Sequence, residues 1–260
     1  MASPKYPLND AVRGTSYLGL SLEETFSQIY ATNAWGKGSG AGSLPAHCLR
    51  WIEFVRKFIK EHHVKSVVDL GCGDWQFSPY IYHDLGVEYV GYDVVPQVIE
   101  ENRSRWASHG FRFQQLEFSS QLANVQDAEL YILKDVLQHW SSARVQDFLS
   151  RLRAAKASAR FILVCNCAEP EDWPEMDIMD GGWRPLHATR PPLSNFDPEV
   201  LFRFPSLPNM KEVCLIHPLR HPQGRTGAVP RPMPLAVRGT ASCCTRRATQ
   251  PPPRRRTPQV

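Results

Sequence analysis

The sequence lacks the features of a membrane-spanning or secreted protein. It contains no apolar run of about 18 residues, the length at which a membrane-spanning helix is suspected. The opening stretch MASPKYPLNDAVRGTSYLGL has no basic segment followed by a continuous apolar one, so it does not read as a secretory signal, although a weak organellar presequence stays open. The seven cysteines are odd in number and scattered, which is not a disulfide pattern. We therefore expect an intracellular, cytoplasmic protein that binds no membrane.

Motifs for metal and nucleoside-triphosphate chemistry are also missing. The chain has no C-x-x-C pair, no H-E-x-x-H and no G-x-x-x-x-G-K-[ST]. Cys165 and Cys167 lie two residues apart on a predicted strand, which is not the spacing of metal ligands. We expect no metal site.

Acidic residues almost disappear near the C-terminus. From Ser206 onward there are ten basic residues and one acid (+9), whereas residues 1–205 hold 20 basic and 25 acidic residues (−5). Past His221 there is no acid and no aromatic residue, and proline and arginine are frequent, so little apolar surface is available to offset the entropy of ordering. We predict a largely disordered tail over residues 206–260. Its arginines fit either a tether to an anionic surface or a solvated tail; they are not interleaved with aromatic residues, which disfavours nucleic-acid binding.

Two helices are predicted ahead of the first strand. Ser21 and Glu24 have the spacing of a capping box, which opens a helix through about Ala31. Within residues 44–62 six apolar residues recur at helical spacing and predict one buried face: Cys48, Trp51, Ile52, Val55, Phe58 and Ile59.

Beyond these helices, continuous apolar strands alternate with amphipathic helices. This pattern predicts an α/β, Rossmann-like, doubly wound and mostly parallel sheet with helices on both faces. KEVCLIHPL is expected to supply a short sixth strand and no seventh strand is found, so we expect the C-terminal edge of the sheet to be incomplete or atypical. The predicted parts are an N-terminal extension (1–20) and a domain (21–205) made of a helical lead-in (21–62), a Rossmann-like core (64–167) and a substrate-side segment (168–205).

The first predicted strand ends abruptly in VVDLGCGDW, residues 67–75. Glycine at 71 and 73 permits positive φ and leaves no side chain between the main chain and a ligand. A dinucleotide site needs a third glycine, where this chain has Gln76, and the acids around the turn disfavour a pyrophosphate. A ligand with cationic groups, such as S-adenosylmethionine (SAM), tolerates such acids.

Asp93 follows the next predicted strand, twenty residues after Gly73. Ligands bind at the carboxyl ends of the strands in such a sheet, so Asp93 can accept hydrogen bonds from ribose hydroxyls. This feature does not discriminate between SAM and a dinucleotide. The alternative is that Asp93 caps the following helix.

VVDLGCGDW, the acid in VGYDVVP, and KDVLQHWS after the fourth strand together resemble a class I SAM-dependent methyltransferase over about residues 20–205. FSQIYATNAWGKGSGAGS and GGWRPLHATRPPLSNF resemble a little-characterised group of these enzymes, in which a W-x-x-G-S-G-x-G-S loop precedes the fold and a W-R-P-L segment follows the fifth strand. The resemblance implies the fold, SAM as cofactor, and transfer of a methyl group to an unidentified acceptor, a small molecule or a saccharide. It does not specify the acceptor, since this fold serves many.

The resemblance also assigns candidate site residues. Glu117 would lie near the adenine amino group and Phe118 would stack on the adenine, while Trp35 belongs either to a flap over the cofactor or to a plain linker. The cofactor-binding candidates are Trp35, Asp69, Gly71, Cys72, Gly73, Asp74, Asp93, Val94, Glu117 and Phe118.

Asp135 and His139 follow the fourth strand and are the catalytic candidates, because an alcohol or protonated amine acceptor needs a base. Each has a structural alternative: a helix cap for Asp135 and a packed ring for His139. Trp183 and Arg184 are the substrate-binding candidates, with a packed corner and a salt bridge as their alternatives.

Two other functions are retained. One is an NAD-linked or nucleotide-sugar Rossmann enzyme, suggested by the strand–glycine–helix turn alone. The other is a non-catalytic methyltransferase-like binding module, suggested by the ragged C-terminal edge. The sequence gives no indication of oligomeric state.

Overall fold

The computed structural model describes residues 10–36, 38–156, 158–168, 176–206 and 209–219. The predicted disorder of the C-terminal tail falls, for residues 220–260, outside the described residues. Within the described part of the chain, no helix combines the length and the apolar character needed to cross a membrane.

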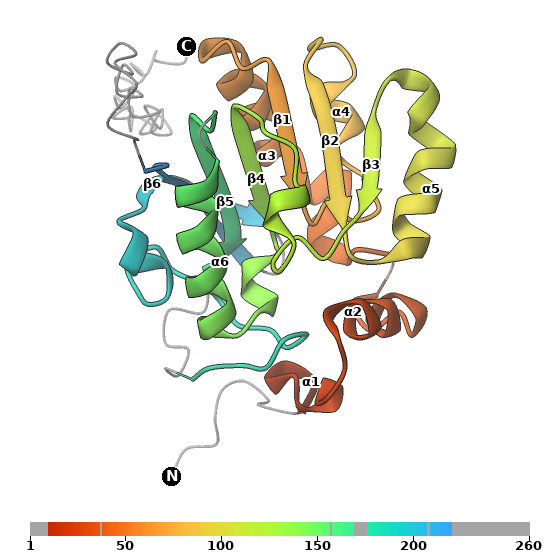
Figure 1. Cartoon of the computed structure of the whole chain (residues 1–260), viewed down its shortest axis with the longest axis vertical. Helices are drawn as coiled ribbons and strands as arrows, with labels where there is room; N and C mark the ends of the chain where they lie inside the picture. Colours follow the sequence, from red (N-terminus) through yellow and green to blue (C-terminus); the bar gives the residue numbers. More distant parts are fainter. Residues whose placement is uncertain (1–9, 37, 157, 169–175, 207–208, 220–260) are drawn as a thin grey trace, which may run out of the picture. The chain divides into compact units, whose positions relative to one another are not determined.

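The described residues form a seven-stranded sheet with the order β3-β2-β1-β4-β5-β7-β6 (Figure 1). β1 to β5 are parallel, and β7 runs antiparallel to both of its neighbours. This arrangement confirms the predicted Rossmann-like α/β class. The strands are β1 (Ser66–Leu70), β2 (Glu88–Asp93), β3 (Arg112–Gln115), β4 (Leu130–Lys134), β5 (Phe161–Cys167), β6 (Glu199–Ser206) and β7 (Asn209–Ile216).

Helices cover both faces of the sheet (Figure 1). α3 (Pro45–Glu61), α4 (Pro79–Tyr82) and α5 (Pro96–Trp106) contribute to the apolar core on one face, and α6 (Ser142–Ala155) contributes to the core on the other. The six residues predicted as the buried face of α3 are its buried residues. Short 3-10 helices complete the described structure: η1 (Thr15–Tyr17), η2 (Ala41–Ser43), η3 (Ala107–His109), η4 (Leu122–Asn124), η5 (Leu137–His139) and η6 (Leu193–Phe196).

The N-terminal helices α1 (Asp10–Arg13) and α2 (Leu22–Ala31) lie at the carboxyl ends of the parallel strands (Figure 1). The predicted capping box opens α2: the Glu24 amide donates to Ser21 Oγ (3.2 Å), and the Ser21 amide donates to Glu24 Oε2 (2.8 Å). Leu22 packs in a small apolar cluster with Val94, Val95 and Val98. α2 is thereby fixed beside the ends of β1 and β2.

The C-terminal edge of the sheet is atypical, one of the two expected outcomes, in that its last two strands are antiparallel; it is not incomplete, because a seventh strand is present. KEVCLIHPL lies in β7, the seventh strand, and β6 precedes it, so the predicted domain end at residue 205 falls inside β6. β6 was not predicted, because most of its side chains are exposed or half-buried and so form no clear hydrophobic pattern. It also contains Pro205, which only an edge strand accommodates readily. The β6–β7 hairpin reaches the carboxyl end of β5, because Cys167 pairs with Lys211.

Candidate functional site

A cavity of about 300 Å³ lies at the carboxyl ends of the parallel strands. Strand order reverses there, since β1 pairs with β2 on one side and β4 on the other, and this is where doubly wound sheets bind ligands. Most of the predicted site residues line this cavity: Trp35, Asp69, Gly71, Cys72, Gly73, Asp93, Val94, Glu117, Phe118, Asp135, His139 and Trp183.

The turn after β1 requires its two glycines. Gly71 and Gly73 have φ values of 80° and 56°, which side chains disfavour. A Cβ on Gly71 would collide with Cγ2 of Val136, and a Cβ on Gly73 would lie 2.6 Å from Ser39 Oγ. The turn is held from inside, because the amides of residues 71 and 72 both donate to the Tyr92 carbonyl (2.8 and 3.0 Å). The cavity wall is therefore bare main chain with its N–H groups already used.

Asp69 is a buried carboxylate beside this turn. It accepts a hydrogen bond from the Tyr89 hydroxyl (2.9 Å), which in turn accepts one from Trp75 Nε1 (2.8 Å). Burial raises the pKa of Asp69 to about 7, against the opposing effects of the Tyr89 hydrogen bond and the Lys134 ammonium. Because burial penalises the charged form, a cation bound in the cavity would stabilise the ionised carboxylate.

Asp93 ends β2 and holds two main-chain amides. Its Oδ2 accepts from the Gly73 amide (3.0 Å) and its Oδ1 from the Val95 amide (3.1 Å), next to the start of α5. Burial raises the pKa of Asp93, and these amide hydrogen bonds oppose the rise. A carboxylate offers about four acceptor sites, so each oxygen keeps one for a hydroxyl group. Asp93 can therefore accept from the Val95 amide at the start of α5 and still bind a ligand in the cavity.

Glu117 and Phe118 line the cavity after β3. The Phe118 ring packs against the rings of Trp140 and Phe148, each with a centroid separation of 5.7 Å. The Glu117 carboxylate accepts from the Ser119 amide (3.1 Å) and from the hydroxyl groups of Ser119 and Ser120. This end of the cavity therefore combines an aromatic wall with a carboxylate.

Asp74 does not line the cavity, contrary to its assignment as a cofactor residue; it fastens the glycine-rich loop to the turn. The Ser39 amide donates to Asp74 Oδ2 (3.0 Å), and the Asp74 amide donates to Ser39 Oγ (3.0 Å). A Cβ on Gly38 would collide with the same carboxylate oxygen, which explains the glycine. The following residues, 39–43, line the cavity.

Trp35 begins this loop and covers His139. The two rings have centroids 4.7 Å apart, and Phe26 and Tyr30 of α2 flank the indole at 5.9 and 5.8 Å. All four side chains line the cavity. Helix α2 and the loop together supply an aromatic wall opposite the ends of the strands.

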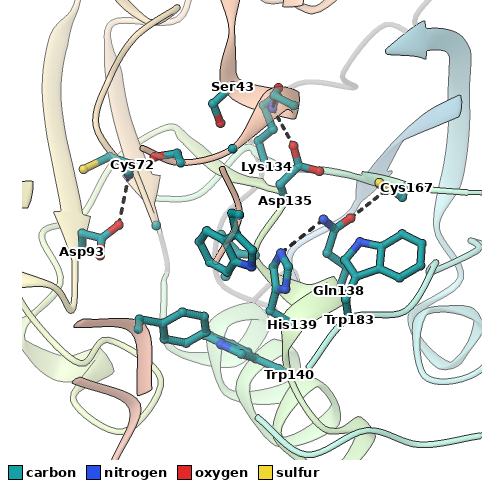
Figure 2. A pocket seen from close by; sticks show the side chains of 18 of the residues that line it. Ser43, Cys72, Asp93, Lys134, Asp135, Gln138, His139, Trp140, Cys167 and Trp183 are labelled. Carbon is teal, nitrogen blue, oxygen red and sulfur yellow. Dashed lines mark hydrogen bonds and ion pairs between the residues drawn. The ribbon is translucent and has the colours of Figure 1, made fainter. Parts of the chain in front are cut away.

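His139 lies at hydrogen-bond distance from Gln138 (Figure 2), and its contacts fix one tautomer. Its Nδ1 lies 2.8 Å from the Gly182 carbonyl oxygen, which can only accept, so Nδ1 carries the proton and Nε2 does not. Gln138 donates from its amide nitrogen to Nε2 (3.4 Å), while its Oε1 accepts from the Cys167 amide (2.8 Å). Burial lowers the pKa of His139 to about 4, in spite of the hydrogen bond to Gly182. The imidazole is therefore neutral at physiological pH.

Asp135 follows β4 with φ of 60° and lies between two buried lysines. Its Oδ2 pairs with Lys134 Nζ (2.6 Å) and its Oδ1 with Lys211 Nζ. Burial works to raise the pKa of Asp135, but the two ammonium groups outweigh it and hold the pKa well below its ordinary value. Asp135 makes these ion pairs instead of the helix cap that was the alternative to a catalytic role.

Arg184 is buried away from the cavity, contrary to its assignment as a substrate residue. Its guanidinium pairs with Asp177 (3.0 Å) and donates to Ser142 Oγ (3.2 Å), which is the salt bridge of the alternative interpretation. Trp183, the neighbouring residue, lines the cavity, and its amide donates to the Val12 carbonyl (2.9 Å).

Several polar cavity residues were not identified from the sequence, among them Lys134, Gln138, Ser206 and Lys211. Lys134 and Gln138 lie in KDVLQHW beside the two catalytic candidates, so their position was available as a signal. Ser206 and Lys211 lie in the segment assigned to the tail, and nothing in their own sequence marks them. No group of three or more metal-ligating side chains is gathered within the described residues.

Comparison with known proteins gives one family match. Residues 50–178 match the model of an O-methyltransferase domain, a segment that covers β1 to β5 and most of the cavity-lining residues. No protein among the curated sequences matches the chain.

Many solved structures are similar to this chain at low sequence identity. Human N-acetylserotonin methyltransferase in complex with SAM is 18% identical, with a TM-score of 0.50 over 80% of this chain and 64% of that chain. Magnesium protoporphyrin IX methyltransferase from Synechocystis with bound SAM is 14% identical, with a TM-score of 0.49 over 80% of this chain and 97% of that chain.

The N-terminal domain of EvdMO1 was solved in the presence of SAH, the demethylated product of SAM, and D-fucose. It is 14% identical, with a TM-score of 0.47 over 65% of this chain and 82% of that chain. At such identities a structural likeness bears on the fold alone. The match to the O-methyltransferase domain and the geometry of the cavity support SAM-dependent methylation of an unidentified acceptor.

Proposed function

We propose that this chain is an enzyme that transfers a methyl group from SAM to an oxygen atom of a small-molecule or saccharide acceptor. The observation that carries the proposal is Asp69, a buried carboxylate with a pKa raised to about 7, beside a turn with glycine at positions 71 and 73. Such a site favours a ligand that brings positive charge and needs no main-chain donors. An intracellular location stays a prediction from the sequence.

The cavity residues fit the separate parts of SAM. Asp69 would hold the cationic amino-acid end against the glycine turn, and the remaining lone pairs of Asp93 would accept from the ribose hydroxyls. Phe118 would pack on the adenine, with Val94 and Glu117 beside it. When bound, SAM supplies a methyl group activated by a cationic sulfonium.

His139 is the base that we assign to the reaction. Its Nε2 carries no proton and its hydrogen bond from Gln138 is long (3.4 Å), so an acceptor hydroxyl bound in the cavity would displace that donor and pass its proton to Nε2. General-base catalysis of this kind gives about 10²- to 10⁴-fold. Asp135 is a poor base, because both of its oxygens are ion-paired with buried lysines. We assign it the role of holding Lys134 and Lys211. Trp35 and the loop that follows it would act as a flap that keeps water from the reacting atoms.

The two alternative functions lose their support. A dinucleotide enzyme would offer turn amides to the pyrophosphate. Here the amides of Gly71 and Cys72 donate to Tyr92, and the Gly73 amide donates to Asp93. The binding-module hypothesis relied on missing strands, and the sheet has both β6 and β7.

Calorimetry with SAM and with its demethylated product SAH tests the proposal. We expect saturable binding of both in the micromolar range, and transfer of a labelled methyl group to at least one member of a panel of hydroxylated small molecules and saccharides. Absence of heat with either compound at high micromolar concentration would contradict it. Binding of both without any transfer would favour the non-catalytic module.

A further inference from the structure

We propose that the methyl acceptor carries an oxyanion group, a carboxylate or a phosphate, and that Lys134 and Lys211 bind it at the β6–β7 end of the cavity. The inference rests on the proposed function and adds the chemical class of the acceptor. Four features of the structure carry it: the charge of the cluster, its unused donor, an unpartnered hydroxyl, and its connection to His139.

The first feature is an excess of buried positive charge. Lys134 and Lys211 are 8% and 3% exposed and share one carboxylate, Asp135, so the three side chains carry a net charge of +1. Burial works to lower the pKa of each lysine, but Asp135 outweighs it and keeps both protonated. Burying an uncompensated charge is costly, so the cluster favours an anion beside it.

The neighbouring groups do not supply that anion. Burial raises the pKa of the thiols of Cys48, Cys165 and Cys167, so all three are neutral. Glu212, next to Lys211 along β7, pairs with Arg203 (2.8 Å). Asp69 interacts with Lys134 through its charge, but bound SAM would compete for that carboxylate and add a further positive charge to the cavity.

The second feature is an unused N–H donor on Lys211. Lys134 Nζ donates to Asp135 and to the Gly42 carbonyl (2.9 Å), and Lys211 Nζ donates to Asp135 and to Cys167 Sγ (3.0 Å). An ammonium group has three N–H donors. Lys134 also lies over the Phe77 ring (4.8 Å to its centroid) and hydrogen-bonds the Cys48 thiol, so it contributes mainly its charge. Lys211 has two hydrogen-bond acceptors among the described residues, which leaves it one donor for a ligand.

The third feature is the hydroxyl of Ser206. This side chain is 3% exposed and lines the cavity, and its Oγ has no hydrogen-bond partner among the described residues. Buried polar groups are nearly always paired, so an orphan hydroxyl at a cavity points to a ligand. Ser206 pairs with Asn209 across the hairpin, and Asn209 is two residues before Lys211, so the three side chains emerge on one face of the sheet. All three line the cavity.

The fourth feature is a line of contacts from this cluster to the base. Lys211 Nζ contacts Cys167 Sγ. The Cys167 amide donates to Gln138, and Gln138 donates to His139, as Figure 2 shows. An acceptor that places a hydroxyl at His139 would therefore have its anionic group within the same cavity at Lys211. The acceptor class is a hydroxylated acid, such as a sugar acid, a hydroxybenzoate or a sugar phosphate.

Anion binding to the SAH-loaded full-length protein tests the proposal directly. The probes are acetate, benzoate and inorganic phosphate, titrated while the melting temperature is followed, at constant ionic strength set with a bulky inert salt. We expect saturable stabilisation by at least one probe in the wild type, and at least a tenfold loss of its affinity, about 1.4 kcal/mol, in Lys211→Met. Which probe binds best distinguishes a carboxylate acceptor from a phosphate acceptor.

Two further variants keep the test independent of folding. Ser206→Ala removes only a hydroxyl and should weaken probe affinity about threefold to tenfold. Lys57→Met, at an exposed lysine of α3, is the matched control and should leave probe affinity unchanged. Equal, non-saturable responses of wild type and Lys211→Met, with SAH still bound, would overturn the anion site and leave the methyltransferase proposal standing. Failure of the wild type to bind SAH at all would instead contradict the proposed function.

Discussion

Asp69→Asn is the substitution that most directly tests the electrostatics of the cavity. Burial raises the pKa of Asp69 from 3.8 to about 7, which corresponds to about 4 kcal/mol between the two protonation states. A carboxyl group whose pKa is raised on folding stabilises the fold below its unfolded pKa, and that contribution is lost as the pH rises through the folded pKa. In the ligand-free wild type, Asp69 therefore reduces the free energy of unfolding by about 1.4 kcal/mol per pH unit between about pH 4 and pH 7.

The Asp69→Asn variant has no carboxyl group that ionises at this position. Relative to the wild type, Asp69→Asn should gain about 2–3 kcal/mol of stability between pH 5 and pH 7.5, and the gain should stop above pH 8. Urea denaturation at pH 5, 6, 7 and 8 measures the difference. Glu53→Gln, at an exposed position on α3, is the control and should follow the wild type at every pH.

The affinity for SAM should change with pH in the opposite direction to the stability of the ligand-free protein. If Asp69 holds a cationic group, SAM should bind the wild type more tightly as the pH rises through 7, with release of a proton, and should bind the variant weakly at every pH. Stability curves of wild type and variant that stay parallel from pH 5 to pH 8 would refute the raised pKa. Unchanged SAM affinity in the folded variant would refute the role of the carboxylate.

Three other substitutions test the remaining assignments. His139→Asn should lower kcat/KM about 10²-fold with little change in SAM affinity. Because the pKa of His139 is about 4, the wild-type rate at saturating SAM should stay level from pH 8 to pH 5, and a fall near pH 6.5 under that condition would contradict the assignment. Asp93→Ala should weaken SAM binding by about 1–3 kcal/mol in calorimetry, and equal affinity in a folded variant would exclude a ribose contact. Gly38→Ala should collide with Asp74, release the loop and lower SAM affinity at least severalfold, whereas wild-type affinity would show that the loop is only a linker.

Local patterns determined the elements that depend on few neighbours in sequence. The buried face of α3 follows from helical spacing within 44–62, and the capping box of α2 needs only Ser21 and Glu24. The glycine turn after β1 was readable because positive φ and close approach restrict the residue type at Gly71 and Gly73. These features, together with the alternation of strands and helices, were sufficient to predict the fold class and the position of the cavity at the strand ends.

Local patterns were insufficient where a residue's surroundings come from distant parts of the chain. Asp74 was assigned to the cofactor from its place in the turn, but it bonds to Ser39, thirty-five residues earlier. Arg184 was assigned to the acceptor from its motif, but its guanidinium donates to Ser142, forty-two residues earlier, as well as pairing with Asp177. In both cases the residue type indicated a charge that needs a partner, without indicating which partner.

The sequence by itself determined the Rossmann-like sheet and the glycine turn, because hydrophobic period and backbone sterics act over a few residues. Only the tertiary structure decided the chemistry at the other end of the cavity. Lys211 meets Asp135 across seventy-six residues, because β7 inserts beside β5, and the mostly exposed strand β6 completes the edge. An edge strand buries little and so leaves a weak hydrophobic pattern. For this reason β6, which carries Ser206, was not recognised, although KEVCLIHPL with Lys211 was predicted as a strand.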